Sequence, residues 1–325
     1  MNIPFRKTLA ATVLFVLGAA GCIAADELPS GKPIAIIVGF VAGGASDTST
    51  RMVARKVSEN IGQPVVVENR PGAGATIATQ YVVNAKPDGA TLILGTIGPI
   101  AVAPHLMQLG YDPIRDLAPI TMGVNFPNVL VVHPSLNVKT LSEFIALAKK
   151  EPGKLTYAAT GVGSASHLAG ELFNQRAGVE ILHVPYKGGA AAMVDLLGGR
   201  ISAYYSTPST AEPHIKSGKL IALATTGLKR SAMFPDIPTI AESGYPGFNA
   251  SNWYAYLAPA KTPEATLDRL NTEIVRALND PDVRTQLAQH GLVPDPMTRK
   301  ELADFIDAES RTWAKVVKER NIKME

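Results

Sequence analysis

The chain has 325 residues, of which 46% are apolar and 18% charged, so it can fill one large hydrophobic core or two smaller ones. Its net charge is only +3 and aromatic residues make up 6% of it. These values disfavour the basic, aromatic-rich surfaces that bind nucleic acid or anionic membranes.

The N-terminus has the pattern of a secretory signal peptide. Arg6 and Lys7 form a short basic start, residues 9–20 are apolar but too few to span a bilayer, and small residues then precede the first acidic ones. We therefore expect residues 1–25 to be removed and the protein to be secreted. This removal takes away two basic residues and no acidic one, which lowers the net charge from +3 to +1.

The only cysteine, Cys22, lies inside this leader. One interpretation is that Cys22 is discarded with the signal peptide. The other is that the chain is cleaved before Cys22, which is then lipidated, because residues 19–22 loosely fit a lipobox. The sequence leaves both interpretations open.

The first strand of the secreted part is expected at 34–38, followed by a loop containing Gly39, Gly43 and Gly44 and by a helix that starts at residue 46 or 47. Such a helix start leaves N–H groups and the positive end of the helix dipole available to an anion. The glycine spacing matches a phosphate-binding P-loop, but Ala45 stands where that motif has lysine. The loop therefore favours a small anion such as a carboxylate.

Strands and helices alternate along the chain, which indicates parallel sheets covered by helices. In the first unit we expect strand 64–68, loop 69–74, helix 75–85, strand 91–95, an extended stretch over 120–132 and a helix capped by Thr140 or Ser142. The same order then starts again with strand 155–159, loop 160–166, helix 167–178, strand 180–186, helix 190–197, strand 201–206, helix 210–217, strand 220–226, a loop over 227–248, strand 252–257 and helices 263–278 and 299–317.

These two units predict two α/β lobes joined by two extended crossings, near 120–130 and 246–256. We expect lobe 1 to contain residues 26–124 and 248–325, with the last helices packed on it, and lobe 2 to contain residues 125–247. Ligands of open α/β sheets bind at the carboxyl ends of the strands, so both glycine loops should face one cleft.

The second loop raises a dinucleotide site as an alternative, because residues 161–166 (GVGSAS) are close to the fingerprint G-x-G-x-x-[GA]. That fingerprint also needs an acidic residue at the end of the next strand, where this chain has Pro185 and Tyr186. In the first unit Glu68 is well placed, but the glycine pattern is absent. A nucleotide-dependent oxidoreductase is therefore the second hypothesis.

Patterns of catalysis or metal binding are absent from the sequence. The six histidines are scattered as single residues, without a spacing typical of zinc sites, and no G-x-S-x-G motif presents a serine nucleophile. We therefore expect a protein that is not an enzyme and that needs neither a metal nor a cofactor.

Four polar residues near the loops have more than one interpretation. His167 either hydrogen-bonds a neighbouring loop or lines the cleft as a polar donor. Ser166 suits a helix cap, whereas Ser164, which projects from the loop, is the better ligand contact. We interpret Asp47 as a cap or first-turn acid, because its carboxylate would repel an anionic ligand.

Seven segments, in order over nearly all of the secreted part, resemble the Bug extracytoplasmic solute receptors, which are the substrate-binding components of tripartite tricarboxylate transporters. The segments are GFVAGGASDTSTR, GQPVVVENRPGAGATIATQYV, AKPDGATLILGT, YAATGVGSASHLAGELF, HVPYKGGAAAMVDLLGGRI, PHIKSGKLIALATT and FPDIPTIAESGYPGF. The resemblance implies a periplasmic protein with the type II periplasmic-binding-protein fold, in which two α/β lobes close on a small, usually carboxylated ligand.

The resemblance also implies ligand contacts in both lobes, with the carboxylate held largely by backbone groups and water. The implied contacts are Phe40, Gly43, Gly44, Thr96 and Gly98 in lobe 1 and Gly161, Gly163, Ser164, His167, Tyr205 and Ser206 in lobe 2.

Two departures from the family pattern bear on the ligand. Val41 and Ala42 replace a proline-rich pair in the first loop, and Ser206 stands where the family often has Asp. An Asp there would favour a ligand with an amino group. We therefore predict a ligand without a cationic group, such as a di- or tricarboxylate or an aromatic acid. The implied partner is the membrane permease of a tripartite transporter or, alternatively, a sensor domain.

Overall fold

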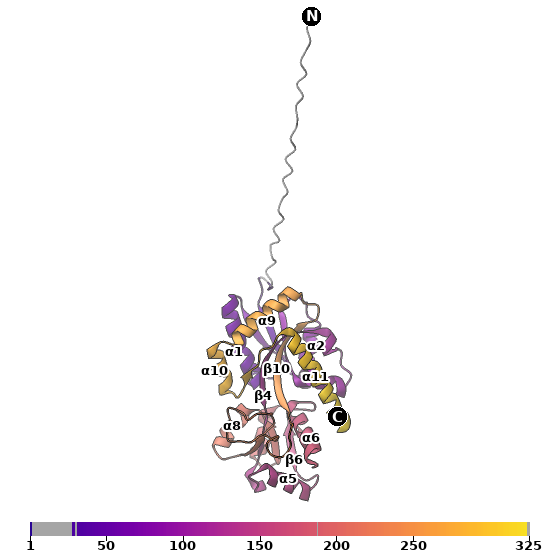
Figure 1. Ribbon diagram of the computed structural model, residues 1–325, viewed down its shortest axis with the longest axis vertical. Helices are drawn as coiled ribbons and strands as arrows, with labels where there is room; N and C mark the ends of the chain where they lie inside the picture. Colours follow the sequence, from indigo (N-terminus) through magenta and orange to yellow (C-terminus); the bar gives the residue numbers. More distant parts are fainter. Residues whose placement is uncertain (2–27, 30, 187, 324–325) are drawn as a thin grey trace.

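The computed structural model describes residues 1, 28–29, 31–186 and 188–323 (Figure 1). The expected signal peptide, apart from Met1, and Cys22 lie outside these residues. Two bodies, each a sheet with flanking helices, are joined by two long strands, β4 (Leu117–Pro127) and β10 (Ser251–Pro259). We call the body that contains the first and last of the described helices lobe 1 and the other lobe 2.

The sheet of lobe 1 has the strand order β11-β4-β10-β3-β1-β2. Its remaining strands are β1 (Ile34–Val38), β2 (Val65–Asn69), β3 (Thr91–Thr96) and β11 (Val293–Pro294). β1 pairs in parallel with β2 and β3, whereas β10 is antiparallel to β3 and β4. β1 and β3 are therefore central and apolar, as the sequence predicts, and are buried along most of their length.

Helices cover both faces of this sheet. They are α1 (Ala45–Ile61), α2 (Thr76–Val83), α3 (Ala103–Leu106), α4 (Pro113–Asp116), α9 (Glu264–Leu278), α10 (Pro281–Gln289) and α11 (Arg299–Glu319), with short helical turns η1 (Ala73–Ala75) and η2 (Gly98–Val102). α9 shows why such segments are helical, since Leu267, Leu270 and Ile274 recur at helical spacing and are all buried.

The sheet of lobe 2 has the order β7-β6-β8-β5-β9. Its strands are β5 (Val129–Val132), β6 (Thr156–Ala159), β7 (Leu182–Pro185), β8 (Ala203–Ser206) and β9 (Ile221–Thr225), and its helical segments are η3 (Pro134–Leu136), α5 (Leu141–Lys150), α6 (Ala165–Ala177), α7 (Gly189–Leu197) and α8 (Pro208–Lys216). β6 pairs in parallel with β7 and β8, and β5 is antiparallel to β8 and β9.

The two sheets have matching topology. The order β2-β1-β3-β10-β4 in lobe 1 corresponds to β7-β6-β8-β5-β9 in lobe 2. In each sheet the chain order reverses beside the first parallel strand, between β1 and β3 and between β6 and β8. Such a reversal leaves a crevice at the carboxyl ends of these strands, which is where open α/β sheets bind ligands.

The two crossings between the lobes are tied together by Thr226. The first crossing is a single residue, Asn128, between β4 and β5, and the second runs from β9 to β10. Thr226 Oγ1 accepts a hydrogen bond from the Asn128 N–H at 2.9 Å and donates one to the Ala250 carbonyl at 3.0 Å. The N–H of Thr226 also donates to the Asn128 carbonyl, so the two crossings form one hydrogen-bonded unit.

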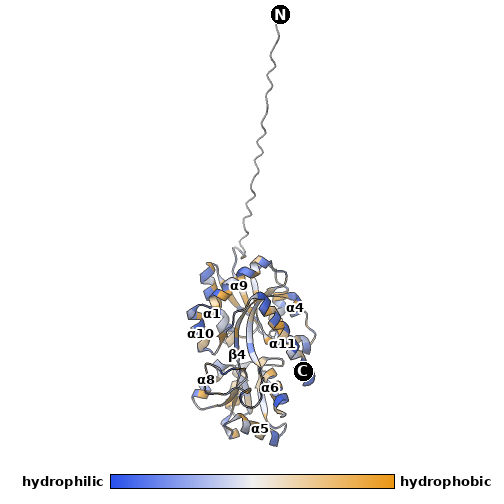
Figure 2. Cartoon of the chain, viewed as in Figure 1, coloured by the Kyte–Doolittle hydropathy of each residue, from blue (hydrophilic) through white to orange (hydrophobic). Residues whose placement is uncertain are grey.

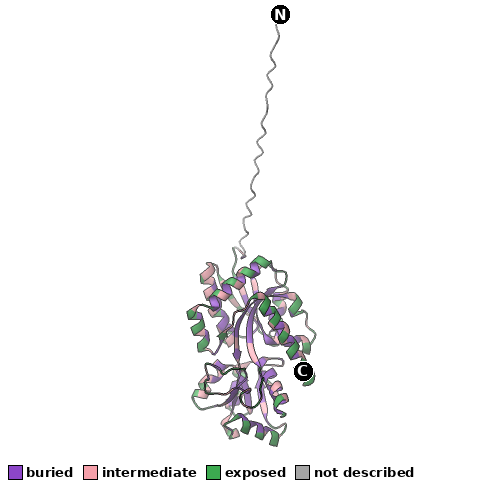
Figure 3. Ribbon diagram, viewed as in Figure 1, coloured by how far each residue is buried: buried purple, intermediate pink, exposed green. Residues whose placement is uncertain are grey.

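Residues of the strands are largely buried, whereas exposed and hydrophilic residues lie mainly on the helices (Figures 2 and 3). One cluster of buried residues runs through both lobes and includes Ile37 and Ile100 of lobe 1 and Leu168 and Phe173 of lobe 2. Within the described part of the chain, none of the helices has both the length and the apolar character that crossing a membrane requires.

Most elements agree with the sequence predictions to within a few residues, including the capping box of α5 at Thr140. The helix expected at 75–85 is α2, which begins at Thr76 after a turn with left-handed backbone. The sequence analysis did not predict the short elements α3, α4 and β11, and it also missed α10. That helix is capped by Asp280, whose carboxylate accepts hydrogen bonds from the N–H groups of Asp282 and Val283.

Candidate ligand site

The predicted site residues gather at the two crevices, where the lobes meet. The first glycine loop (39–44) follows β1 and the second (160–164) follows β6, while Thr96 ends β3 and Ser206 ends β8. Gly98 and Gly163 face each other across the lobes, because a Cβ atom added to Gly98 would lie 3.4 Å from the Gly163 carbonyl oxygen. A Cβ on Gly163 would lie 3.0 Å from Leu106 Cδ1 of lobe 1. The segment after β3 in lobe 1 and the second glycine loop of lobe 2 are therefore closely packed at this point.

Asp47 holds the first glycine loop from within helix α1. Its Oδ2 accepts the Gly43 N–H at 2.9 Å, and its other hydrogen bonds come from Arg51 and from Asn69 Nδ2. Burial raises the pKa of Asp47, but the hydrogen bonds from Arg51, Gly43 and Asn69 outweigh burial and hold it below its usual value. Asp47 is therefore a first-turn acid, as expected, and its carboxylate accepts one of the backbone N–H groups of the loop.

Asn69, which the sequence analysis did not single out, links this loop to the end of β2. Its amide nitrogen donates to the Phe40 carbonyl at 3.0 Å as well as to Asp47, and its amide oxygen accepts from Arg51. Phe40 itself is half-buried and packs against the apolar cluster below α1, while Gly43 and Gly44 are exposed. The backbone of the loop is thus fixed on one side and open to solvent on the other.

A strained turn packs beneath the first loop. Four successive residues, Gly72 to Ala75, have positive φ angles of 147°, 45°, 60° and 74°. Such angles are costly for alanine and concentrate at functional sites. A Cβ atom on Gly39 would lie 2.2 Å from the Cβ of Ala75, so Gly39 is required for close packing rather than for loop flexibility. In the sequence, residues 70–74 (RPGAG) indicated a loop at this place.

The serine of the second glycine loop that caps α6 is Ser164, not Ser166 as we expected. Ser164 is the N-cap of α6, since its Oγ accepts the His167 N–H at 3.3 Å and donates to the Gly161 carbonyl at 2.7 Å. Ser166 is the second residue of α6, and its Oγ accepts the Thr160 N–H at 3.0 Å. The expectation that Ser166 caps the helix was wrong, because the loop turns one residue pair earlier than its sequence indicated.

His167 supports the second loop as a hydrogen-bond acceptor. Its Nδ1 accepts the Gly163 N–H at 3.0 Å, and its ring stacks on that of His183, with ring centroids 3.9 Å apart. Burial and, to a smaller extent, the charge of His183 lower the pKa of His167 to about 3, so the ring stays neutral at neutral pH. This hydrogen bond matches the first interpretation of His167, in which it holds a neighbouring loop.

The remaining predicted residues are buried at strand ends. Thr96 and Ser206 occupy matching positions in the two sheets, and the Ser206 hydroxyl donates to the Thr207 carbonyl at 3.2 Å. The Tyr205 side chain, in contrast, lies in the core of lobe 2, where its ring packs against Tyr157 and Phe173. The structure therefore brings ten of the eleven predicted residues to the loops or strand ends and places the Tyr205 ring behind α6.

Two α/β lobes of matching topology, each with a glycine loop after its first parallel strand, define the class of two-lobed solute-binding proteins. Residues 49–322 match the family model described as tripartite tricarboxylate transporter family receptor. The chain belongs to this family, and both the two-lobed fold and the family resemblance expected from the sequence are confirmed.

Three relatives illustrate the similarity. The Bordetella pertussis protein BugT is 40% identical over 322 residues, covering 98% of each chain. A solved structure of Rhodopseudomonas palustris Rpa4515 with adipate is 34% identical with a TM-score of 0.84, covering 91% of this chain and 99% of that one. MatC from the same organism, with bound malate, is 32% identical with a TM-score of 0.81, covering 89% and 99%.

Proposed function

We propose that the protein is a periplasmic receptor that captures a small carboxylated solute between its lobes and presents it, chemically unchanged, to the membrane permease of a tripartite tricarboxylate transporter. The observation that carries the proposal is the close approach of Gly98, which follows β3 in lobe 1, to Gly163 in the second glycine loop of lobe 2, so that each lobe presents the ends of its central strands to the other. The adipate and malate bound to two relatives support the chemical class of the ligand.

We propose that each lobe contributes the contacts that the sequence predicted, with the lobe boundaries at residues 26–124 and 248–325 and at 125–247. The contacts are Phe40, Gly43, Gly44, Thr96 and Gly98 together with Gly161, Gly163, Ser164, His167, Tyr205 and Ser206, the last two at the end of β8. Neutral groups organise the second loop, which suits an anionic ligand held by backbone N–H groups.

Ser206 supports a ligand without an amino group, because a neutral hydroxyl at the end of β8 supplies no charge to balance an ammonium group. The dinucleotide alternative gains no support, since β7 ends at Pro185, where a ribose-binding site would need an acidic residue.

A thermal-shift panel tests the proposal. The panel contains adipate, malate, citrate and benzoate, with glutamate as a zwitterionic control and NAD as the test of the alternative. A ligand at about 100 times its dissociation constant stabilises the native state by about 2.7 kcal/mol. We expect a clear rise in the melting temperature with at least one acid of the first group. A larger rise with glutamate would contradict the ligand class, and a rise with NAD alone would contradict the receptor function.

A further inference from the structure

The C-terminal helix α11 belongs to lobe 1 but reaches lobe 2. Its middle is fixed to lobe 1 because Glu309 accepts hydrogen bonds from Trp253 Nε1 of β10 at 3.0 Å and from Trp313 Nε1 at 3.1 Å. Its side also supports the turn where the lobes meet, since His105 of α3 and Ser310 are joined at 2.9 Å. The helix is therefore held to lobe 1 beside α3, whose Leu106 lies close to Gly163 of lobe 2.

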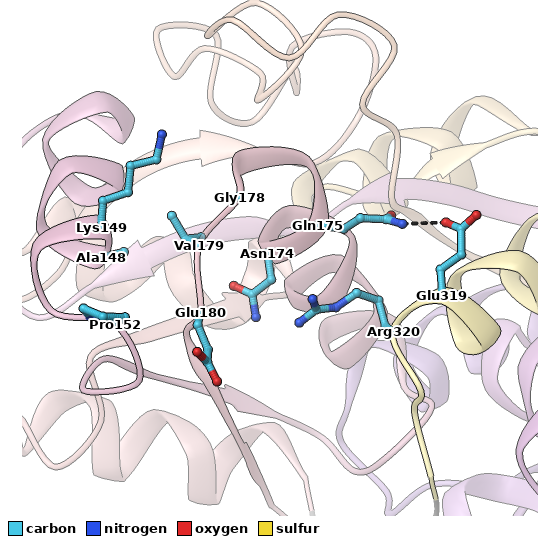
Figure 4. Close-up of a pocket in the computed structure, with 10 residues that line it drawn as sticks. All are labelled: Ala148, Lys149, Pro152, Asn174, Gln175, Gly178, Val179, Glu180, Glu319 and Arg320. Carbon is cyan, nitrogen blue, oxygen red and sulfur yellow. Dashed lines mark hydrogen bonds between the residues drawn. The ribbon is translucent and has the colours of Figure 1, made fainter.

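Beyond this anchored part, the end of α11 contacts α6 in lobe 2. Arg320 Nε donates to Glu171 Oε2 at 2.9 Å, and Gln175 Nε2 donates to Glu319 Oε2 at 2.6 Å. Figure 4 shows the second of these hydrogen bonds at the edge of a cavity of about 520 Å³ between α5, α6 and the end of α11. Glu171 is 8% exposed, so its pairing with Arg320 is shielded from solvent on the side of the carboxylate.

Glu171 continues this connection into the second glycine loop. Its other oxygen, Oε1, accepts the Tyr157 hydroxyl at 2.8 Å, and the same hydroxyl lies 3.3 Å from the His167 carbonyl oxygen. His167 in turn accepts the Gly163 N–H at 3.0 Å. A continuous series of contacts thus runs from the end of a lobe 1 helix to the loop of lobe 2 that faces Gly98.

We propose that Arg320 is a positioning residue for the second glycine loop: through Glu171 and Tyr157 it fixes the first turn of α6, so that the loop is ordered only while α11 is docked on lobe 2. Contact between the lobes at α11 is then a requirement for the order of the loop, and Tyr157 transmits it. The inference rests on the proposed function only in taking this loop as a ligand contact, because the coupling itself is a property of the protein without ligand.

The test uses the full chain without ligand and two measurements. Hydrogen exchange reports the order of the segment 163–167, and spin labels on cysteines placed at Ile114 of α4 and Val194 of α7 report the distance between the lobes. Both positions are exposed, and labelling is specific in a Cys22→Ser background because Cys22 is the only cysteine. Arg320→Met removes the charge and keeps much of the side-chain length. Arg230→Met is the matched control, because Arg230 Nε also donates to a carboxylate at 2.9 Å, but within lobe 2.

We expect Arg320→Met to speed exchange of the loop amides roughly tenfold, the size expected from losing a charge-assisted hydrogen bond, and to shift the label distances to longer values. Arg320→Lys should restore part of both effects and Arg230→Met should show neither. If Arg320→Met behaves like Arg230→Met in both measurements, the proposal is wrong.

Tyr157→Phe separates positioning from general stabilisation. This variant leaves the Arg320–Glu171 pair in place and removes only the hydroxyl that joins Glu171 to the His167 backbone. We expect faster exchange of the loop with an unchanged distance between the lobes. Unchanged loop exchange in Tyr157→Phe would overturn the proposal. Neither measurement needs a ligand, so a failure of the thermal-shift panel would leave this result intact and would count only against the proposed function.

Discussion

The two glycine loops follow the same order of strand, loop and helix, but different groups hold them in shape. The first is fixed by a charged group, the Asp47 carboxylate, which is paired with Arg51 and Asn69. The second is fixed by neutral ones, the Ser164 hydroxyl and the His167 ring. The comparison indicates that the first loop depends on an ion pair for its shape, whereas the second depends on uncharged groups.

The largest effect is expected at the base of the first loop, from Gly39→Ala. The added methyl group would lie 2.2 Å from Ala75 Cβ and 2.8 Å from its Cα, and the backbone there is already strained. We expect the free energy of unfolding, measured in urea, to fall by about 3 kcal/mol. Gly44→Ala is the control, because the nearest atom to its added Cβ is 3.8 Å away. An equal loss in both variants would show that packing on Ala75 is not the cause.

Asp47→Ala tests whether one charged group organises the first loop. The substitution leaves the Gly43 N–H and Arg51 without their buried partner, so we expect a loss of about 2–3 kcal/mol in the free energy of unfolding at neutral pH. Asp112→Ala removes a comparable but exposed acceptor of two backbone N–H groups and should cost about 1 kcal/mol. If Asp47→Ala costs no more than Asp112→Ala, the loop does not depend on this charge.

The neutral ring of His167 predicts a pH dependence for the second loop. Burial and the charge of His183 lower its pKa in the folded protein to about 3, whereas the unfolded chain binds the proton below about 6.5. The free energy of unfolding is therefore unaffected by this ring above pH 6.5 and falls as the pH drops towards 3, with a loss of about 2 kcal/mol at pH 5. His167→Asn keeps an acceptor for the Gly163 N–H and cannot titrate, so denaturation curves of this variant should lack that component. Identical pH profiles would rule out His167 as its source.

Ser164→Ala gives the smallest change in stability but separates the loop from an ordinary helix cap. We expect a loss of about 1 kcal/mol in the free energy of unfolding, because α6 loses its cap. We also expect binding of the carboxylate with the largest thermal shift to weaken by about 1–3 kcal/mol in calorimetry. Thr140→Ala removes the equivalent cap of α5 and should cost similar stability with unchanged affinity. Unchanged affinity in Ser164→Ala would remove Ser164 from the ligand contacts.

The sequence predicted the fold well where local patterns decide the structure. The apolar runs of β1 and β6 and the glycines after them placed both loops correctly. The sequence did not predict features in which a residue's role depends on contacts with residues outside its own local pattern. Ser164 and Ser166 are both good caps, and only the turn at Gly161 decides between them. The pairing of Arg320 with Glu171 joins residues 149 positions apart, and no local pattern could indicate it.

The single hydroxyl of Thr226 also limits how this protein can be changed. Because Thr226 bonds to both crossings, a bend in one crossing must either displace the other or break these hydrogen bonds. A selection for variants that open more or less readily should therefore return substitutions at Asn128, Thr226 and Ala250 in addition to those at the contact between α11 and α6.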